Sequence, residues 1–425
     1  MTTFRFIHTG DIHLDSPLKG LAGHEGATAE RIRTATRAAF INLIDYAIEE
    51  TIEFVVIAGD LYDGDWRDYN TGLFFIGQMG RLAKANIPVF LSYGNHDAES
   101  QITKRLVLPE NVKVFSSRKP QMFEHAALKV ALHGQSFKQR DVTDNLVPAY
   151  PAPIAGSFNI GVLHTGLGGM GGHLNYAPCS LDDLVNKGYD YWALAHVHQG
   201  ATLHQNPHVV FCGNLQGRHI RESGIKSASV VTVQDGAVTD IFPLECDVVR
   251  WAGVTVPVED CLQISDVIDR IHRAVSHAAT NDGAGRLLAC RVALTGRTGL
   301  HGQLVASSEL LTAEGRAAAL ALGDEAAWVE RVVIGTKMRV DPATLLMRQD
   351  ALSDLQSFMA EAAADQTLRS QLESDVGELV RKLPHDARTD LEEGVLKAAI
   401  GGNYADVVDQ ASRYLMARLT TTDGA

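Results

Sequence analysis

Seven side chains of metal-binding type follow apolar segments in the first half of the sequence. They are Asp11 and His13 in FIHTGDIHLD, Asp60 in EFVVIAGD, Asn95 in SYGNHD, His164 in GVLHTG, and His196 and His198 in ALAHVHQG. Taken singly, each has a structural explanation, such as a helix cap, a turn residue or a buried histidine. Together, carboxylate, amide and imidazole groups without a thiolate favour a site for two divalent metal ions.

The apolar segments before these residues predict strands, and they alternate with segments of helical periodicity. Apolar residues recur at helical spacing within residues 30–50 and 70–86, which predicts an amphipathic helix in each. This alternation is typical of layered α/β folds. Because ligands in such folds gather beyond the carboxyl ends of strands, the polar clusters are expected to lie near one another.

Later apolar segments at residues 208–214, 227–233 and 237–244 predict further strands, which complete a second sheet. The expected fold class is α/β: a two-sheet β-sandwich flanked by helices, with a small α+β domain and a C-terminal helical region. We expect the sandwich in residues 1–245, the small capping domain in 246–345 and the helical region in 346–425. Aliphatic stripes in the last region indicate a core or, alternatively, a partner surface. They comprise Leu352, Leu355, Met359, Val376, Leu379, Val380 and Leu383.

Composition narrows the class of protein. A chain of 425 residues with 45% apolar content can bury at least one large core. The formal net charge of -13 argues against a general nucleic-acid coat, because phosphate affinity comes from clustered Lys and Arg, but it leaves room for an enzyme that holds DNA locally. No leader-like segment or membrane-spanning apolar run is visible, so we expect a soluble, cytoplasmic protein without membrane contact. The five cysteines form no CxxC pair and are expected to be idle thiols.

The motifs DIH, GDLYD, GNHD, LHTG and AHVH occur in this order across the first two hundred residues. They resemble the five-part signature of calcineurin-like metallophosphoesterases. The segments FIHTGDIHLDSPL, NYAPCSLDDL and GNLQGRHIRESG are similar to the bacterial DNA-repair exonuclease branch called YhaO, which is related to SbcD and the Mre-type nucleases. The resemblance covers roughly residues 1–245. One departure is Ala195, where many members have glycine; if that position needs a positive φ, the turn would be strained.

The resemblance implies a role for each candidate ligand. Asp11, His13 and His198 would bind one metal ion, Asn95, His164 and His196 the other, and Asp60 would bridge both. Four imidazoles beside oxygen ligands favour Mn²⁺, with Fe or Zn as alternatives. Four other histidines of the region are not expected to be ligands; these are His8, His24, His133 and His173.

His96 follows a ligand in the GNHD motif and is the candidate catalytic acid, with Asp97 as a candidate partner that orients it. Asp63, at the end of GDLYD, is expected either beside the ligands or facing the substrate. Arg218 and His219 are candidate substrate-binding residues. Their segment is interpreted either as a phosphate clamp beside the metals or as a solvated turn, with equal weight.

The resemblance further implies a hydrolase: a DNA exonuclease of 3'-to-5' polarity in DNA repair, with endonuclease activity as an addition. A small-molecule or cyclic-nucleotide phosphodiesterase remains an alternative, as does a regulatory subunit of an ATPase. The expected partners are DNA and an SMC-like coiled-coil ATPase of the YhaN or SbcC type, and a homodimer is left open. A net-negative enzyme would gain from a partner that contributes DNA-binding surface.

Overall fold

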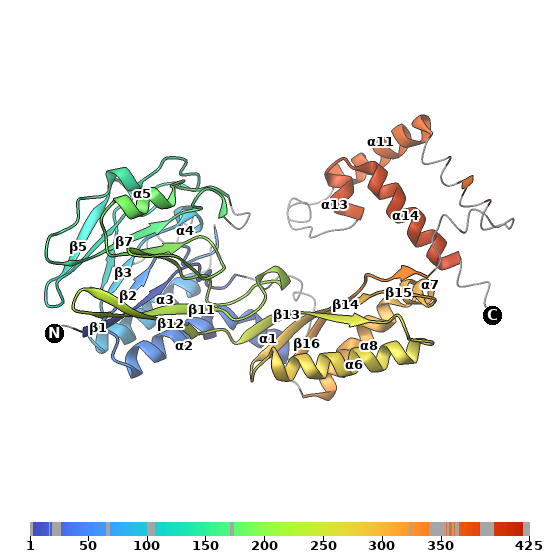
Figure 1. The fold of residues 1–425 in the computed structure, drawn as a ribbon, viewed down its shortest axis with the longest axis horizontal. Coiled ribbons are helices and arrows are strands. Elements are labelled where there is room, and N and C mark those ends of the chain that lie inside the picture. The colour runs from blue at the N-terminus through green and yellow to red at the C-terminus, as the bar shows by residue number, and fades with distance from the viewer. Residues whose placement is uncertain are drawn as a thin grey trace. The chain divides into compact units, whose positions relative to one another are not determined.

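The computed structural model describes residues 3–16, 18, 27–64, 69–99, 107–170, 174–323, 325–339, 354, 357–358, 361, 365–382 and 395–419. The chain divides into two compact units. The first comprises Met1–Ala252, Ala278–Ala289 and Gly323–Trp328, and the second comprises Gly253–His277, Cys290–Leu322 and Val329–Ala425. Figure 1 labels the elements of both units. The three-part division expected from the sequence stays a prediction.

The first sheet of the first unit combines a parallel half with an antiparallel edge. Strands β1 to β4 pair in parallel along the sheet, and β11 pairs antiparallel with β1 on one side and with β12 on the other. The order is β12 (Ala237–Glu245), β11 (Ser227–Gln234), β1 (Thr3–Thr9), β2 (Phe54–Ile57), β3 (Val89–Leu91) and β4 (Val112–Val114). The carboxyl ends of β1, β2 and β3 therefore meet at one edge of the sheet.

The second sheet also combines parallel strands with antiparallel strands at its edges. Strands β6, β7, β8 and β10 run parallel, and an antiparallel strand closes each side. The order is β5 (Gln121–His125), β6 (Val130–Gly134), β7 (Phe158–His164), β8 (Tyr191–Ala195), β10 (His208–Phe211) and β9 (Ala201–Gln205). The register places His164 opposite Ala195, so the polar segments after β7 and β8 begin side by side.

Apolar side chains join the two sheets face to face. Phe6 of β1 stacks on Phe54 of β2, with ring centroids 5.0 Å apart, and meets Tyr191 of β8 edge-on at 5.3 Å. Val162 and Ala193 of the second sheet belong to the same buried cluster. Burial of such residues drives this packing. The expected two-sheet sandwich is confirmed (Figure 1). Residues 227–233 and 237–244, which were expected to complete the second sheet, instead lie in β11 and β12 of the first sheet.

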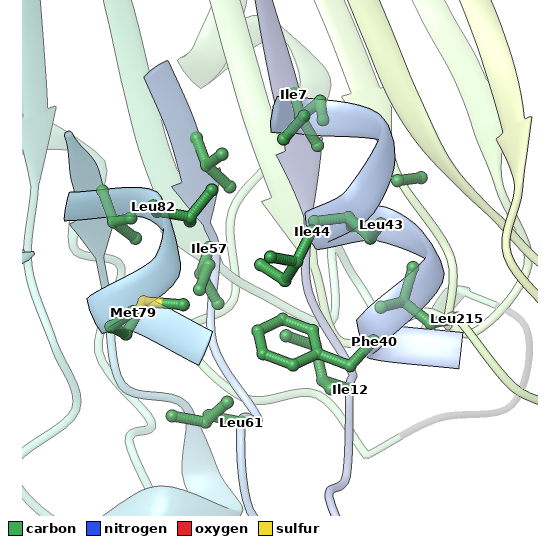
Figure 2. Close-up of a cluster of buried hydrophobic side chains, with 14 of the residues drawn as sticks. Ile7, Ile12, Phe40, Leu43, Ile44, Ile57, Leu61, Met79, Leu82 and Leu215 are labelled. Carbon is green, nitrogen blue, oxygen red and sulfur yellow. The ribbon is translucent and has the colours of Figure 1, made fainter. Parts of the chain in front are cut away.

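Two helices cover the outer face of the first sheet: α2 (Ala35–Glu49) and α3 (Tyr69–Lys84). Figure 2 shows Phe40 and Leu43 of α2 and Met79 of α3 pointing into one apolar cluster with strand residues. The sequence predicts a single helix over residues 30–50, but α1 (Ala27–Arg33) ends before α2 begins. Thr34 lies between them, and its hydroxyl donates to the carbonyl of Glu30 at 3.0 Å, a local bond that competes with regular helix geometry.

The first unit also contains short helices between its strands. They are α4 (Asn95–Glu99), the 3-10 helices η1 (Val147–Ala149) and η3 (Ile220–Glu222), and α5 (Leu181–Asn186). Ser180 caps α5 through a capping box with Asp183. A buried cluster around Trp192 and Leu184 packs the outer face of the second sheet.

The second unit contains strands, helices and the C-terminal helices. A three-stranded sheet, β13 (Val249–Pro257), β14 (Leu287–Thr295) and β16 (Ala327–Ile334), begins within the first unit and lies mostly in the second. The other elements are α6 (Ile264–Asn281), α7 (His301–Ala306), α8 (Ser308–Ala321), the pair β15 (Arg297–Thr298) and β17 (Lys337–Met338), α11 (Gln366–Lys382), α13 (Val395–Ile400) and α14 (Tyr404–Leu419).

The aliphatic stripes are only partly described. Val376, Leu379 and Val380 lie on α11, and Leu379 is 66% exposed. The other members lie outside the described residues; they are Leu352, Leu355, Met359 and Leu383. Within the part of the chain that is described, no helix combines the length and apolarity needed to cross a membrane.

Candidate active site

All seven candidate ligands lie together at the carboxyl ends of strands from both sheets. The two sheets contribute from opposite sides: Asp11 and His13 after β1, Asp60 after β2, Asn95 at the start of α4 after β3, His164 at the end of β7, and His196 and His198 after β8. All are buried except His198, whose side chain is 15% exposed. The strand-end argument therefore predicted their proximity correctly.

The backbone of this region adopts the left-handed conformation at several non-glycine positions. The φ angle is 45° at Asp11, 46° at His13, 51° at Asp60 and 104° at His196. Such backbone costs about 1–3 kcal/mol per residue and concentrates at functional sites. Hydrogen bonds between the two loops hold it, from Asp11 N to Gly59 O at 3.0 Å and from His13 N to Asp60 O at 3.0 Å.

One group of ligand atoms comes from the turns after β1 and β8. Nε2 of His13 and Nε2 of His198 lie 3.3 Å apart. Oδ1 of Asp11 lies 3.9 Å from Nε2 of His198. The ligand atoms of these three residues all lie within 4.8 Å of one another, a spacing that one divalent ion can span.

A second group lies next to the first, and its member Asp60 also lies close to His13 of the first group. Oδ2 of Asp60 lies 3.4 Å from Nε2 of His164 and 3.9 Å from Nε2 of His13. Oδ1 of Asn95 is 3.0 Å from Nε2 of His164. Asp60, His164 and His196 offer ligand atoms within 4.8 Å of one another. The carboxylate of Asp60 thus lies between the two groups, where a bridging ligand would be.

Oxygen acceptors fix the orientation of three imidazole rings. Nδ1 of His164 faces the carbonyl of Ala58 at 3.2 Å, and Nδ1 of His198 faces Oε1 of Glu222 at 2.7 Å. Nε2 of His196 faces the carbonyl of Leu174 at 2.8 Å. At His196 and His198 the oxygen acceptor requires the facing nitrogen to carry the proton, so the other ring nitrogen keeps the lone pair that a metal ion needs. Nε2 of His164 also faces an oxygen, Oδ1 of Asn95.

The hydrogen bonding of the Asp11 carboxylate shows whether the site fits a cation. Oδ2 of Asp11 accepts the backbone N–H of His196 at 2.8 Å. Oδ1 of Asp11 is buried and has no hydrogen-bond partner among the described residues. A buried charged oxygen without a partner is costly, and a metal ion would satisfy it. The donor set and this atom therefore fit a divalent cation.

Burial and neighbouring charges shift the pKa values of the ionisable groups in the site. Burial acts to raise the pKa of Asp60, but the adjacent imidazole of His164 holds that pKa well below its usual range. Burial, together with the charge of Arg218, lowers the pKa of His13, and burial lowers the pKa of His198 to about 4 although Glu222 opposes the shift. Both latter shifts favour neutral imidazole, the form that coordinates metals.

His96 lies beside the ligands, and its partner differs from the expected one. Nδ1 of His96 is 3.1 Å from Oδ1 of Asp63. Burial acts to lower the pKa of His96, but the hydrogen bond that its ring donates to Asp63 and the charges of Asp60 and Asp63 together raise it. The carboxylate of Asp97 instead accepts backbone N–H groups, including that of Tyr62 at 2.9 Å. Asp63 rather than Asp97 therefore orients His96, and Asp97 holds the loop after β2.

Arg218 and His219 lie at the edge of the same cluster. Nη1 of Arg218 is 3.8 Å from Oδ1 of Asp63, and Nη2 is 3.2 Å from Oε1 of Glu222. Nε2 of His219 is 3.5 Å from the same Glu222 oxygen. Glu222 was missed by reasoning from sequence, although an acidic residue four positions after Arg218 in GRHIRESG was a usable signal.

Two of the four histidines that were not expected to be ligands are described, and each contacts another polar side chain. His8 contacts the Tyr191 hydroxyl at 3.0 Å, and His133 contacts Asn159 at 3.0 Å, both away from the ligand atoms. His24 and His173 lie outside the described residues. The five cysteines are buried and form no disulfide.

The departure at Ala195 causes no strain in the turn. The positive φ falls on His196, while Ala195 remains in β8. A methyl group at Gly10, on the facing sheet, would lie 2.5 Å from the Ala195 Cβ. The small residue is therefore needed at Gly10, and the alanine is accommodated.

Comparisons with known proteins agree with this constellation. The family model of calcineurin-like phosphoesterases matches residues 4–202, and that of the middle domain of metallophosphoesterase YhaO matches residues 251–337. A Bacillus subtilis (strain 168) protein described as uncharacterized metallophosphoesterase YhaO is 34% identical over 280 residues, which are 65% of this chain and 68% of that protein. The chain belongs to the YhaO-like metallophosphoesterases.

More distant proteins are also similar to this metallophosphoesterase. The DNA double-strand break repair protein Mre11 of Saccharolobus solfataricus is 24% identical over 209 residues, which are 48% of this chain and 51% of that protein. The chain thus spans about half the length of Mre11. A solved dimetal phosphatase from Danio rerio is 9% identical, with 55% of this chain and 94% of that chain covered and a TM-score of 0.35. Membership of the family makes the chain a hydrolase of phosphoesters with a site for divalent metal.

Proposed function

We propose that this metallophosphoesterase is a dinuclear-metal phosphodiesterase that acts as a DNA exonuclease of 3'-to-5' polarity in DNA repair. The position of the Asp60 carboxylate between the two ligand groups carries the two-metal part of the proposal. The likeness to Mre11, which is named as a repair protein, supports DNA as the substrate. Polarity and additional endonuclease activity rest on the resemblance of the motifs.

The proposed ligand sets follow the two groups. Asp11, His13 and His198 would hold one ion, and Asp60 would contribute to both. The other ion would be held by Asn95, His164 and His196. Bound divalent ions would provide Lewis-acid stabilisation of charge on the phosphate and a nucleophilic water near neutral pH. The imidazole-rich set favours Mn²⁺, with Fe or Zn as alternatives.

His96 supplies the proton that the reaction needs. Asp63 holds Nδ1 of the His96 ring, which leaves Nε2 as the atom available to the substrate. When the phosphorus–oxygen bond to the leaving group breaks, that oxygen takes the proton from His96 Nε2. The raised pKa of His96 favours the protonated ring, which is the form that a general acid needs.

Arg218 is the proposed contact to the DNA phosphates. Its guanidinium lies at the cluster edge and is 3.4 Å from the hydroxyl of Ser16, which itself donates to Asp63. Arg218→Ala should weaken DNA binding and flatten its dependence on salt by about one unit of slope. Arg81, paired with Asp45 near the end of α3, gives a matched control. An unchanged slope for Arg218→Ala would favour a purely local role.

An SMC-like coiled-coil ATPase of the YhaN or SbcC type is the proposed partner. Leu379 on α11 and Tyr414 on α14 are large apolar side chains that are more than half exposed, and such residues are frequent at docking surfaces. Leu379→Asp should therefore abolish co-purification of the ATPase while cleavage of a small diester persists. Persistent association would refute this surface, and size-exclusion chromatography would distinguish it from a homodimer contact.

The activity test compares substrates on one preparation. Purified protein with Mn²⁺ is incubated with 3'- and 5'-end-labelled single- and double-stranded DNA and, in parallel, with a cyclic dinucleotide, with Asp60→Asn as the inactive control. We expect mononucleotides to be released from 3' ends, and EDTA to stop the release. Cleavage of the cyclic dinucleotide alone would show a small-molecule phosphodiesterase. Inactivity on every substrate would instead favour a regulatory subunit.

A further inference from the structure

A carboxylate outside the candidate ligand set contacts both the candidate ligand His198 and Arg218. Glu222 ends η3, and its side chain is 7% exposed. We propose that Glu222 is a positioning residue that holds the His198 ring as a metal ligand and orients Arg218 beside it. This inference rests on the proposed two-metal site and extends it to a residue that belongs to neither ligand group.

The contact with His198 sets which ring nitrogen is free. Oε1 of Glu222 lies 2.7 Å from Nδ1 of His198. Since a carboxylate oxygen only accepts, Nδ1 carries the proton and Nε2 keeps its lone pair. Nε2 is the atom that lies 3.3 Å from Nε2 of His13 and 3.9 Å from Oδ1 of Asp11. Glu222 thus orients the ring toward one of the two proposed metal positions.

The other contacts of Glu222 fix Arg218. Oε2 accepts the backbone N–H of Arg218 at 2.7 Å and the side-chain amide of Asn214 at 3.0 Å. Nη2 of Arg218 donates to Oε1 at 3.2 Å. The two carboxylate oxygens therefore receive four donors from the chain. Glu222 joins the turn after β8 to the segment after β10, which brings a ligand and a guanidinium to the same edge.

A purely structural role would have a different consequence. If Glu222 only anchored the segment after β10, its replacement would lower the stability of the fold and leave the relative affinities of the two ions unchanged. A positioning role through His198 should weaken one ion selectively. Partners that orient metal-bound histidines typically contribute 10–100-fold in metal affinity.

The test measures metal binding instead of turnover. Metal-free full-length protein is titrated with Mn²⁺ by calorimetry, for the wild type, Glu222→Gln and the control Glu245→Gln. Glu245 also pairs with two arginines, Arg250 and Arg286, but lies outside the cluster. We expect two Mn²⁺ per wild-type chain, one ion weakened at least tenfold in Glu222→Gln, and both retained in Glu245→Gln. In a His198→Ala background, Glu222→Gln should have no further effect on Mn²⁺ affinity.

The outcomes separate this inference from the function on which it rests. A wild-type chain that binds fewer than two Mn²⁺ would refute the two-metal site itself. Two wild-type sites with both ions unchanged, or equally weakened, in Glu222→Gln would refute only the role of Glu222. If Glu222→Gln does not fold, Glu222→Asp keeps the charge but shortens the reach to His198. Wild-type affinity for both ions in Glu222→Asp would then refute the positioning role.

Discussion

Gly94 offers the most direct test of the site geometry, because a single methyl group there would reach two candidate ligands. A Cβ at Gly94 would lie 2.3 Å from Oδ1 of Asp60 and 2.9 Å from Cε1 of His164. Non-bonded carbon atoms settle at about 3.5–4.0 Å, so the second contact alone is short by about 0.6–1.1 Å. Asp60 cannot yield freely, since its Oδ1 also accepts the backbone N–H of His96 at 3.0 Å.

We therefore expect Gly94→Ala to displace the Asp60 carboxylate by roughly 1 Å. A shift of that size is enough to reduce catalysis by about 10²-fold, and overpacking should also reduce the free energy of unfolding by about 1–3 kcal/mol. Hydrolysis of bis(p-nitrophenyl) phosphate with Mn²⁺, together with metal analysis, measures the first effect, and urea unfolding measures the second.

Gly77→Ala provides the matched control for Gly94→Ala. A Cβ at Gly77, within α3, meets no atom within 4 Å. Replacing a helical glycine by alanine should leave activity intact and stabilise by about 0.5–1 kcal/mol. Full activity and two bound ions in Gly94→Ala would show that the Asp60 and His164 positions are wrong.

Three further outcomes are expected. Asp60→Ala should lose both Mn²⁺ ions in metal analysis, whereas His198→Ala should weaken mainly one; full double occupancy in Asp60→Ala contradicts the bridge. His96→Ala should keep two ions yet lose ~10²–10⁴-fold in rate, and loss of metal instead would make it a ligand. Burial lowers the pKa of His8 to about 3, below its usual value, so the unfolded chain takes up a proton first as the pH falls. In EDTA, the free energy of unfolding of the wild type should therefore fall as the pH drops below about 6.5. The fall should exceed that of His8→Gln by up to about 1.4 kcal/mol per pH unit. Equal urea midpoints at pH 5 and 7 in both proteins would contradict this.

The placement of the ligands could be predicted because it depends on local pattern and on one topological rule. Each apolar segment marks its own strand, and parallel strands bring their carboxyl ends to one edge. Asp60 and His164 are 104 positions apart in the chain, yet their strand-end positions alone predicted that they meet. The break at Thr34 could not be predicted in this way, because no glycine or proline interrupts the helical pattern there.

The partners of the ligands were harder to predict, because they depend on side-chain direction. Asp97 is adjacent to His96 in sequence, but neighbouring residues on a helix point in different directions. Asp63 comes from another loop and reaches the His96 ring instead. Glu222 meets His198 only because β10 returns the chain to the turn after β8. Such contacts follow from the tertiary fold, and no periodicity in the sequence reports them.

The site concentrates several unfavourable features in one place, and together they explain its construction. Asp11, His13 and Asp60 hold left-handed backbone, and Oδ1 of Asp11 is buried without a hydrogen-bond partner among the described residues. Each feature alone would be selected against in a purely structural strand end. The two packed sheets beneath them, in which Phe6 stacks on Phe54, hold the loops in this unfavourable conformation. A divalent cation would offset the charge at this point, so the local rules are broken where the chemistry requires it.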